Sequence, residues 1–343
     1  MTASGMEGVR LVELWRGEIL ESLHCGHVVI CGPDGEIEES WGNPDQVILP
    51  RSSAKMLQAL PLVESGAAAR AGLGPQHLAL ACASHEGTAR HAGLVSDWLA
   101  DQGMGPGDLL CGAQSPWDRA ERNRMICAEA ALSPLHNNCS GKHAGFLTLS
   151  RDLGAGADYI DMAHPVQAAA LAAHEEVTGE TSPGYGIDGC AAPNHATTLH
   201  GLARAMSRYA TAGGRADARS RAQAALTEAM MAHSDLVAGE GRPCTELMRA
   251  TTEPVAIKFG ADGVFIAILP AQGRGVAIKI SDGATRGVDC VIAAVLVRLG
   301  VLDPAHPSAQ RFLTGPIRNR RGDAVARLAP VRDLIGAANF TKI

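Results

Sequence analysis

A serine and a lysine stand three positions apart at a predicted helix start, in the segment Pro-Arg-Ser-Ser-Ala-Lys at residues 50–55. In a helix, Ser52 and Lys55 would lie on one face, with hydroxyl and amine within reach of each other. A lysine with a lowered pKa can take the proton of a serine, which then becomes a nucleophile. The backbone N–H groups of the helix start would stabilise an oxyanion. Alone, the tetrapeptide equally describes a capping serine and a surface lysine.

Two later motifs favour the catalytic interpretation. Penicillin-recognising enzymes combine Ser-x-x-Lys with a second hydroxyl that relays protons and with a Lys-Thr-Gly on a late strand. Here Ser84 lies in Cys-Ala-Ser-His-Glu-Gly-Thr at 82–88, and Lys258 begins Lys-Phe-Gly at the end of a predicted strand. A helix-capping serine and a solvated lysine are the alternatives. The three motifs together are better explained by catalysis than by three separate structural roles.

Lysine is scarce in this chain. Of the 30 basic residues only five are lysine, at positions 55, 142, 258, 279 and 342. A GC-rich coding sequence would give the same bias. However, a buried lysine can lose its proton and an arginine cannot, so the remaining lysines are candidates for positions that need a neutral amine.

Two polar, glycine-containing segments each hold one cysteine: His-Asn-Asn-Cys-Ser-Gly-Lys-His at 136–143 and Gly-Ile-Asp-Gly-Cys-Ala-Ala-Pro-Asn at 186–194. The thiolates of Cys139 and Cys190, with one nitrogen ligand, would suit a zinc ion that keeps an open position. Imidazole is the commoner nitrogen ligand, so residue chemistry alone favours His143. Two buried free cysteines are the alternative.

Composition excludes several classes of protein. The 343 residues carry a formal charge of −6 and no basic run, which argues against nucleic acid or an anionic membrane as partner. Hydrophobic residues make up 46% of the chain, as in a globular protein. The apolar stretch 288–302 is too short to span a bilayer. With no secretory pattern at the N-terminus, the nine cysteines are expected to be reduced thiols in the cytoplasm.

Strand patterns occur at both ends of the chain and helical patterns between them. The opening segment alternates apolar and polar residues around the turn Pro-Asp-Gly at 33–35, which predicts an antiparallel meander. Ala-rich helical segments fill the next two hundred residues, and strands return between 254 and 281. We therefore expect one α+β domain over 1–343, with an antiparallel sheet from about 9–40 and 254–281, a central helical lobe, and helices after 285.

The motifs together resemble one family. PRSSAK, CASHEGT, NNCSGKHAGF, GIDGCAAPN and KFGADGVF are similar, in this order, to segments of the class 3 or rhizobial-type L-asparaginases, also called the asparaginase II family. The resemblance implies a fold like those of serine β-lactamases and glutaminases. It also implies hydrolysis of L-asparagine to L-aspartate and ammonia, and a homodimer.

The resemblance assigns roles to individual residues. It makes Ser52 with Lys55, and Ser84 with Lys258, two Ser–Lys pairs. It implies Cys139, Lys142 and Cys190 as zinc ligands, so that His143 becomes a candidate substrate contact together with Arg51 and Asp188. Lysine is an unusual ligand because the amine must be deprotonated to coordinate.

The resulting hypothesis is acyl-enzyme catalysis in the cytoplasm with a positional zinc ion. Ser52 attacks the side-chain amide after Lys55, held neutral by burial and by the Lys258 cation, takes its proton. A glutaminase, a penicillin-recognising Ser–Lys hydrolase and a non-enzymatic metal-binding protein are the alternatives. Glutamine differs from asparagine by one methylene, which is worth only about 1–3 kcal/mol of discrimination.

Overall fold

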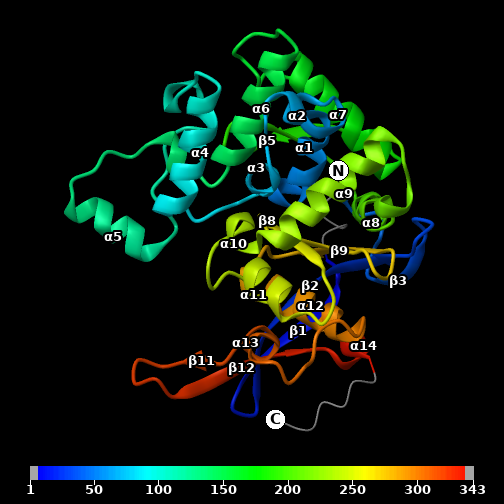
Figure 1. The fold of residues 1–343 in the computed structure, drawn as a ribbon. Coiled ribbons are helices and arrows are strands. Elements are labelled where there is room, and N and C mark those ends of the chain that lie inside the picture. The colour runs from blue at the N-terminus through cyan, green and yellow to red at the C-terminus, as the bar shows by residue number, and fades with distance from the viewer. Residues whose placement is uncertain (1–6, 337–343) are drawn as a thin grey trace.

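The computed structural model describes residues 7–336, in which strands from the two ends of the chain form one antiparallel sheet (Figure 1). Its spatial order is β11-β12-β1-β2-β10-β9-β8, and β3 also pairs with β2. The strands of this sheet are β1 (Val9–Arg16), β2 (Ile19–Cys31), β3 (Ile37–Trp41), β8 (Ala256–Gly260), β9 (Val264–Leu269), β10 (Arg274–Ile280), β11 (Ile317–Arg318) and β12 (Ala324–Pro330).

The chain between β3 and β8 is mainly helical and contains two small strand pairs. In these, β4 (Val47–Ile48) pairs with β7 (Thr197–Thr198), and β5 (Tyr185–Ile187) pairs with β6 (Pro193–His195). The helices are α1 (Lys55–Glu64), α2 (Ala67–Arg70), α3 (Pro75–Ala81), α4 (Ala89–Asp101), α5 (Arg119–Cys127), α6 (Ser140–Asp152), α7 (Pro165–Thr178), α8 (Leu199–Ala210), α9 (Ala218–Ala232), α10 (Ser234–Val237) and α11 (Pro243–Ala250).

Helices cover the sheet, because its central strands are apolar on both faces. Every residue of β9 is buried, a pattern that needs cover on each side. The helix α8 packs on β2, β9 and β10, whereas α12 (Thr285–Arg298) packs on β1, β9 and β10. Two shorter helices, α13 (Pro307–Leu313) and α14 (Arg332–Ile335), pack against α12.

The α+β arrangement agrees with the sequence prediction, but the C-terminal part of the described chain adds strands that were not expected. Helices alone were expected after 285, but β12 pairs with β1 in antiparallel register, with Leu14 opposite Leu328. The segment 324–330 is rich in alanine, which has a low strand propensity, so its pairing with β1 and β11 makes it a strand. Within residues 7–336, no helix is long and apolar enough to cross a membrane.

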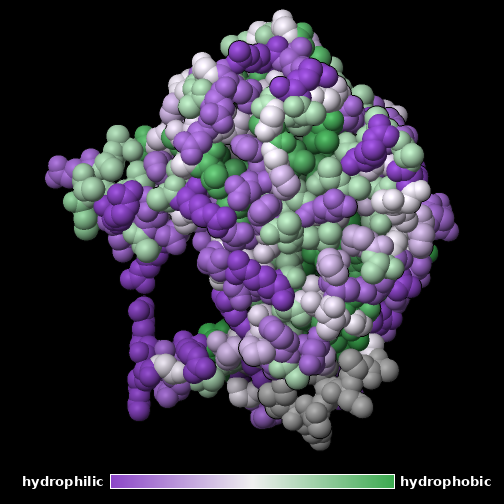
Figure 2. All heavy atoms as spheres, viewed as in Figure 1, coloured by the Kyte–Doolittle hydropathy of each residue, from purple (hydrophilic) through white to green (hydrophobic). Residues whose placement is uncertain are grey.

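Two segments project from the body on the same side, on the left in the view of Figure 2. One carries α5 and the other is the hairpin of β11 and β12 (Figure 1). Hydrophilic residues cover much of the face seen in Figure 2. The site described below lies where the helical lobe meets the sheet edge formed by β8.

Candidate active site

Ser52 lies on a short 3₁₀ turn, η2 (Arg51–Ala54), that leads directly into α1. Arg51 adopts the left-handed conformation, with φ of 53°, which is uncommon for a residue with a side chain. The side chain of Asn194 holds it there: its Oδ1 accepts from Arg51 N at 3.0 Å and its Nδ2 donates to Arg51 O at 3.3 Å. Such local strain is typical of functional sites.

The β8 edge of the sheet contacts the same turn through a glycine. A Cβ atom on Gly260 would lie 2.5 Å from Pro50 O and 2.9 Å from Ser53 N. Only glycine therefore allows β8 to approach the turn this closely. This contact brings Lys258, two residues earlier on β8, toward the start of α1.

Ser84 lies in the loop that follows α3, and neighbouring elements fix its backbone. Its N–H donates to Val237 O at 2.9 Å, and the N–H of His85 donates to Asn138 O at 3.2 Å. The side chain of Ser84 is fully buried.

Two lysines converge on the Ser84 hydroxyl. Lys55 Nζ and Lys258 Nζ each lie 2.9 Å from Ser84 Oγ. Lys55 also donates to Ala83 O, and Lys258 donates to Phe259 O at 2.9 Å. The exposed fractions of the two lysines are 1% and 0%. Burial, followed by the charge of Lys55, lowers the pKa of Lys258 from 10.5 to about 7.

The four predicted catalytic residues are therefore gathered in one region, but Ser84, expected to pair with Lys258, is contacted by both lysines. Lys55 is hydrogen-bonded to Ser84, whereas Ser52 stands three residues before Lys55 and lines the adjacent cleft. Ser84 is closed off from solvent and Ser52 is only half-buried. A substrate in the cleft can reach the Ser52 hydroxyl directly, and the buried hydroxyl of Ser84 can connect the two lysines.

The cleft has a volume of about 510 Å³ and polar groups of both signs. Its residues from the predicted motifs are Arg51, Ser52, Asn137, Asn138, Cys139, Asp188, Gly189, Cys190, Phe259 and Ala261. Arg51 forms an ion pair with Asp188 and lies 3.3 Å from the Asp262 carboxylate. A guanidinium beside a carboxylate is suited to the carboxylate and ammonium groups of an amino acid.

The side chains predicted to bind zinc are close together below the cleft. Cys139 caps α6, and Lys142 lies one turn later on the same helix, so both point to one side. Lys142 Nζ lies 3.2 Å from Cys190 Sγ, and Cys139 Sγ donates to Asn138 Oδ1 at 3.5 Å. All three side chains are at least 95% buried, with exposed fractions of 5%, 2% and 4% for Cys139, Lys142 and Cys190.

The surroundings of Cys190 favour the thiolate form of its side chain. The hydrogen bond from Cys139, together with the charge of Lys142, lowers the pKa of Cys190 against the effect of burial. Burial lowers the pKa of Lys142, but the neighbouring thiolates raise it overall. Among residues 7–336, no group of three or more His, Cys, Asp and Glu side chains is placed to hold a metal ion.

His143 lies behind this cysteine–lysine group. Its side chain is fully buried, and its Nδ1 lies 3.0 Å from the Tyr159 hydroxyl. It is absent from the residues that line the cleft, so a substrate there would not contact it without a rearrangement. Burial lowers the pKa of His143 to about 4, which keeps the ring neutral at pH 7.

Sequence reasoning gave no role to several residues of the site. Asn194 closes the quoted motif at 186–194, and its polar side chain after a proline was the available signal. Trp117 lines the cleft from the α5 segment, and the Arg242 guanidinium lies 5.7 Å from the Trp117 ring centre and 5.6 Å from that of Phe259. Trp117 and Arg242 lie outside the quoted motifs, and Phe259 is the middle residue of Lys-Phe-Gly, to which no role was given.

A sheet built from both chain ends, a helical lobe and a serine–lysine cluster beside a polar cleft define this protein as an α+β hydrolase. The model of the L-asparaginase II family matches residues 12–330. The chain belongs to this family. No curated protein matches it.

Solved structures resemble the chain only distantly. A structure described as Mglu in its native form is 14% identical, with a TM-score of 0.46, and the alignment covers 82% of this chain and 66% of that one. A putative β-lactamase from Bacteroides dorei DSM 17855 is 13% identical, with a TM-score of 0.42 over 77% and 90% of the two chains. A β-lactamase from Mycobacterium bovis is 11% identical, with a TM-score of 0.36 over 77% and 89%.

Proposed function

We propose that this protein hydrolyses L-asparagine to L-aspartate and ammonia through an acyl-enzyme on Ser52. The observation that carries the proposal is the buried cluster in which Lys55 and Lys258 share the Ser84 hydroxyl beside the half-buried Ser52. Family membership supplies the substrate class. The ion pair of Arg51 and Asp188 supports binding of the α-carboxylate and α-ammonium groups of the substrate.

The two lysines would act together through Ser84. With both protonated, the cluster would hold two buried positive charges, which burial disfavours. Once the pair has lost one proton, the Ser84 hydroxyl can accept a proton from Lys55 and donate its own to Lys258. This transfer leaves Lys55 neutral, as a general base requires, without changing the total charge.

The reaction balances with groups of this chain, the substrate and one water. Lys55 takes the proton of Ser52, whose oxygen forms a bond to the amide carbon and gives a tetrahedral oxyanion. The carbon–nitrogen bond then breaks, and the proton returns through the lysine–Ser84 relay to the departing ammonia. Water, deprotonated by the same relay, hydrolyses the aspartyl ester and restores Ser52.

A zinc ion fits the group formed by Cys139, Lys142 and Cys190 once the Lys142 ammonium has given up its proton, because two buried thiols and an amine are the sulfur and nitrogen donors that zinc prefers. When bound, it would supply a fixed positive charge that positions the polar head of the substrate. The residues of the serine–lysine cluster provide nucleophile and base by themselves. We therefore propose a positional role for the metal.

The cellular setting is proposed on similar grounds. All nine cysteines are free thiols, which supports a reducing compartment such as the cytoplasm. The family resemblance supports a homodimer, which light scattering of the purified protein would test.

Ammonia release from separate solutions of asparagine and glutamine tests the proposed activity. We expect release from asparagine, and a loss of kcat of roughly 10³-fold or more in Ser52→Ala. Faster release from glutamine would make the protein a glutaminase. Turnover of nitrocefin without ammonia release would favour a penicillin-recognising hydrolase, and no turnover of any of these compounds would favour a metal-binding protein.

A further inference from the structure

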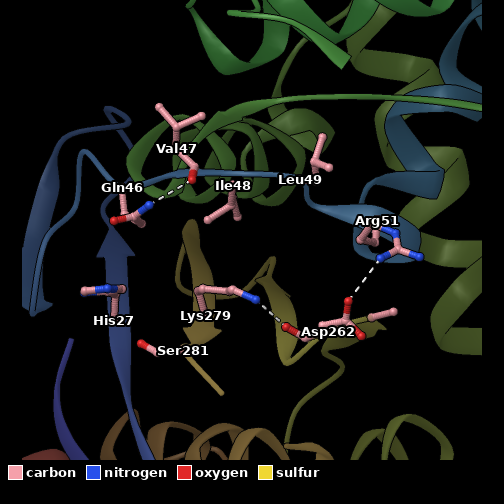
Figure 3. Close-up of a pocket in the computed structure, with 10 residues that line it drawn as sticks. His27, Gln46, Val47, Ile48, Leu49, Arg51, Asp262, Lys279 and Ser281 are labelled. Atoms are coloured by element: carbon pink, nitrogen blue, oxygen red, sulfur yellow. Dashed lines mark hydrogen bonds and ion pairs between the residues drawn. The ribbon is translucent and has the colours of Figure 1, made fainter. Parts of the chain in front are cut away.

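A second cavity, of about 230 Å³, adjoins the cleft on the other side of Arg51 (Figure 3). Its floor comes from β2 at His27 and from the end of β10, and the segment 46–49 lies across from them (Figure 3). Lys279, the lysine of the described chain that the proposed function does not use, lines this cavity together with His27 and Ser281.

Strand register explains why these three side chains meet. Lys279 is directly opposite His27 in the antiparallel pairing of β10 and β2. Ser281 follows two residues after Lys279, and its N–H donates to Cys25 O at 2.9 Å. Since side chains two residues apart point to the same face of a strand, Lys279, His27 and Ser281 share one face of the sheet.

The hydrogen bonds of His27 make its buried nitrogen a donor. His27 is 97% buried, with an exposed fraction of 3%. Its Nδ1 accepts from Asn43 N at 2.9 Å, so the ring proton must lie on Nε2. Among the residues that the structure describes, Nε2 has no hydrogen-bond partner. A donor buried without a partner is costly, so such an atom marks a position where a ligand can bind.

Ser281 and Lys279 can donate as well, whereas the Gln46 amide donates to Val47 O. The buried Ser281 Oγ has no hydrogen-bond partner within residues 7–336, and the Lys279 ammonium donates to the carbonyl of Asp262 with protons to spare. The Asp262 carboxylate is turned toward Arg51, 3.3 Å from Nη1. Two buried donors without a partner, on the sheet face that also carries the Lys279 charge, match a single anionic group.

The charge and the walls restrict the ligand further. Lys279 contributes one positive charge and His27 none, since burial and the Lys279 charge lower the pKa of its imidazole. A monoanion therefore fits better than a dianion. The remaining walls include the apolar side chains of Val47, Ile48, Leu49 and Ala261. These side chains suit a short hydrocarbon group attached to the anion.

We propose that this cavity is a binding site for a small aliphatic monocarboxylate, held by His27 Nε2, Ser281 Oγ and Lys279 Nζ. The carboxylate oxygens would accept from the imidazole and the hydroxyl while the ammonium balances the charge. The proposal does not depend on asparagine hydrolysis, because none of these three side chains belongs to the serine–lysine cluster.

Nuclear magnetic resonance of the His27 ring tests the proposal with the full-length protein. Butyrate is the probe, sodium chloride at equal ionic strength is the reference, and the ring signal is assigned by its loss in His27→Asn. We expect a saturable shift of the ring resonances with a dissociation constant in the millimolar range, and no comparable shift with chloride. No saturable shift, or an equal response to inorganic phosphate, would overturn the proposal.

Variants distinguish binding of butyrate in this cavity from a general effect of protein charge. Lys279→Met should abolish the saturable shift, and Ser281→Ala should weaken binding several-fold. Arg274→Met is the matched control, because it removes one positive charge from the other end of β10, where Arg274 pairs with Glu38. Butyrate should raise the Tm of the wild type and of the control but not of Lys279→Met. Undiminished binding in a folded Lys279→Met would contradict the assignment, and Lys279→Gln provides the same comparison if the methionine variant does not fold.

Discussion

Lys258 Nζ lies 2.9 Å from the hydroxyl oxygen of Ser84, which accepts a second hydrogen bond of equal length from Lys55. Two lysines on one buried hydroxyl are an unusual arrangement, because each charge disfavours the other. The arrangement has measurable consequences for pH dependence, stability and catalysis.

Activity should rise with pH through the neutral range. Burial and the charge of Lys55 lower the pKa of Lys258 to about 7, and the lysine pair must lose one proton before Lys55 can act as a base. We expect kcat/KM for asparagine to increase with an apparent pKa near 7 and to level off above it. A profile that peaks near pH 5 would exclude an amine as the base.

Lys258→Met should stabilise the fold while abolishing turnover. The pKa of Lys258 is lower in the folded protein, at about 7, than the ordinary 10.5, so the unfolded state binds more protons between these values. The stability of the wild type therefore rises with pH across that window. Replacing the buried amine with an apolar chain of similar length should raise the free energy of unfolding by about 1–4 kcal/mol near neutral pH.

The pH dependence of this increase in the free energy of unfolding provides an internal control. The advantage of Lys258→Met, measured by denaturant unfolding, should shrink as pH approaches 10.5, where lysine is neutral in both states. A gain that is constant with pH would trace the stabilisation to packing, and a destabilised variant would refute the lowered pKa.

Gly260→Ala should damage both the fold and the site. The new Cβ would lie 2.5 Å from Pro50 O, so β8 must move away from the turn that presents Ser52. We expect a loss of about 1–3 kcal/mol in stability and a lower kcat. Gly93→Ala is the matched control, since Gly93 lies inside α4 with open space around its Cα and should gain about 1 kcal/mol. Wild-type kcat in Gly260→Ala would show that this contact does not position Ser52.

Zinc should bind in equimolar amount and depend on the two buried thiols. Cys139→Ala and Cys190→Ala should each lose the metal, measured by elemental analysis of the purified protein. Cys127→Ser, an exposed thiol at the end of α5, should keep it. Removal of zinc by a chelator should raise KM more than it lowers kcat. A collapse of kcat at saturating asparagine would instead give the metal a direct part in the chemistry.

The sequence predicts the sheet well where its patterns are local. The turn at 33–35 and the alternating apolar strands around it need no partner to be recognised, and β9 and β10 are equally clear. The strand β12 is not recognisable, because its alanines become a strand only beside β1 and β11. The short pairing of β4 with β7 likewise depends on segments about 150 residues apart.

The candidate site likewise combines features that a local sequence pattern indicates with features that only contacts between distant segments create. Residue type and spacing suggest Ser52 with Lys55, and Cys139 as a metal ligand, whereas residue chemistry favoured His143 and only the family resemblance implied Lys142. The meeting of Lys55 with Ser84, the support of Arg51 by Asn194 and the burial of His143 arise from contacts between distant segments. Such contacts leave no periodic signal in a single sequence.

The most direct test of the central claim is to locate the acyl group. The protein is mixed with asparagine, quenched with acid during turnover and digested with trypsin, and its peptides are examined by mass spectrometry. An aspartyl ester on Ser52, in the peptide 52–55, is the predicted result, and it should be absent in Ser52→Ala. An aspartyl group on Ser84 or on a cysteine, or undiminished ammonia release by Ser52→Ala, would contradict Ser52 as the nucleophile.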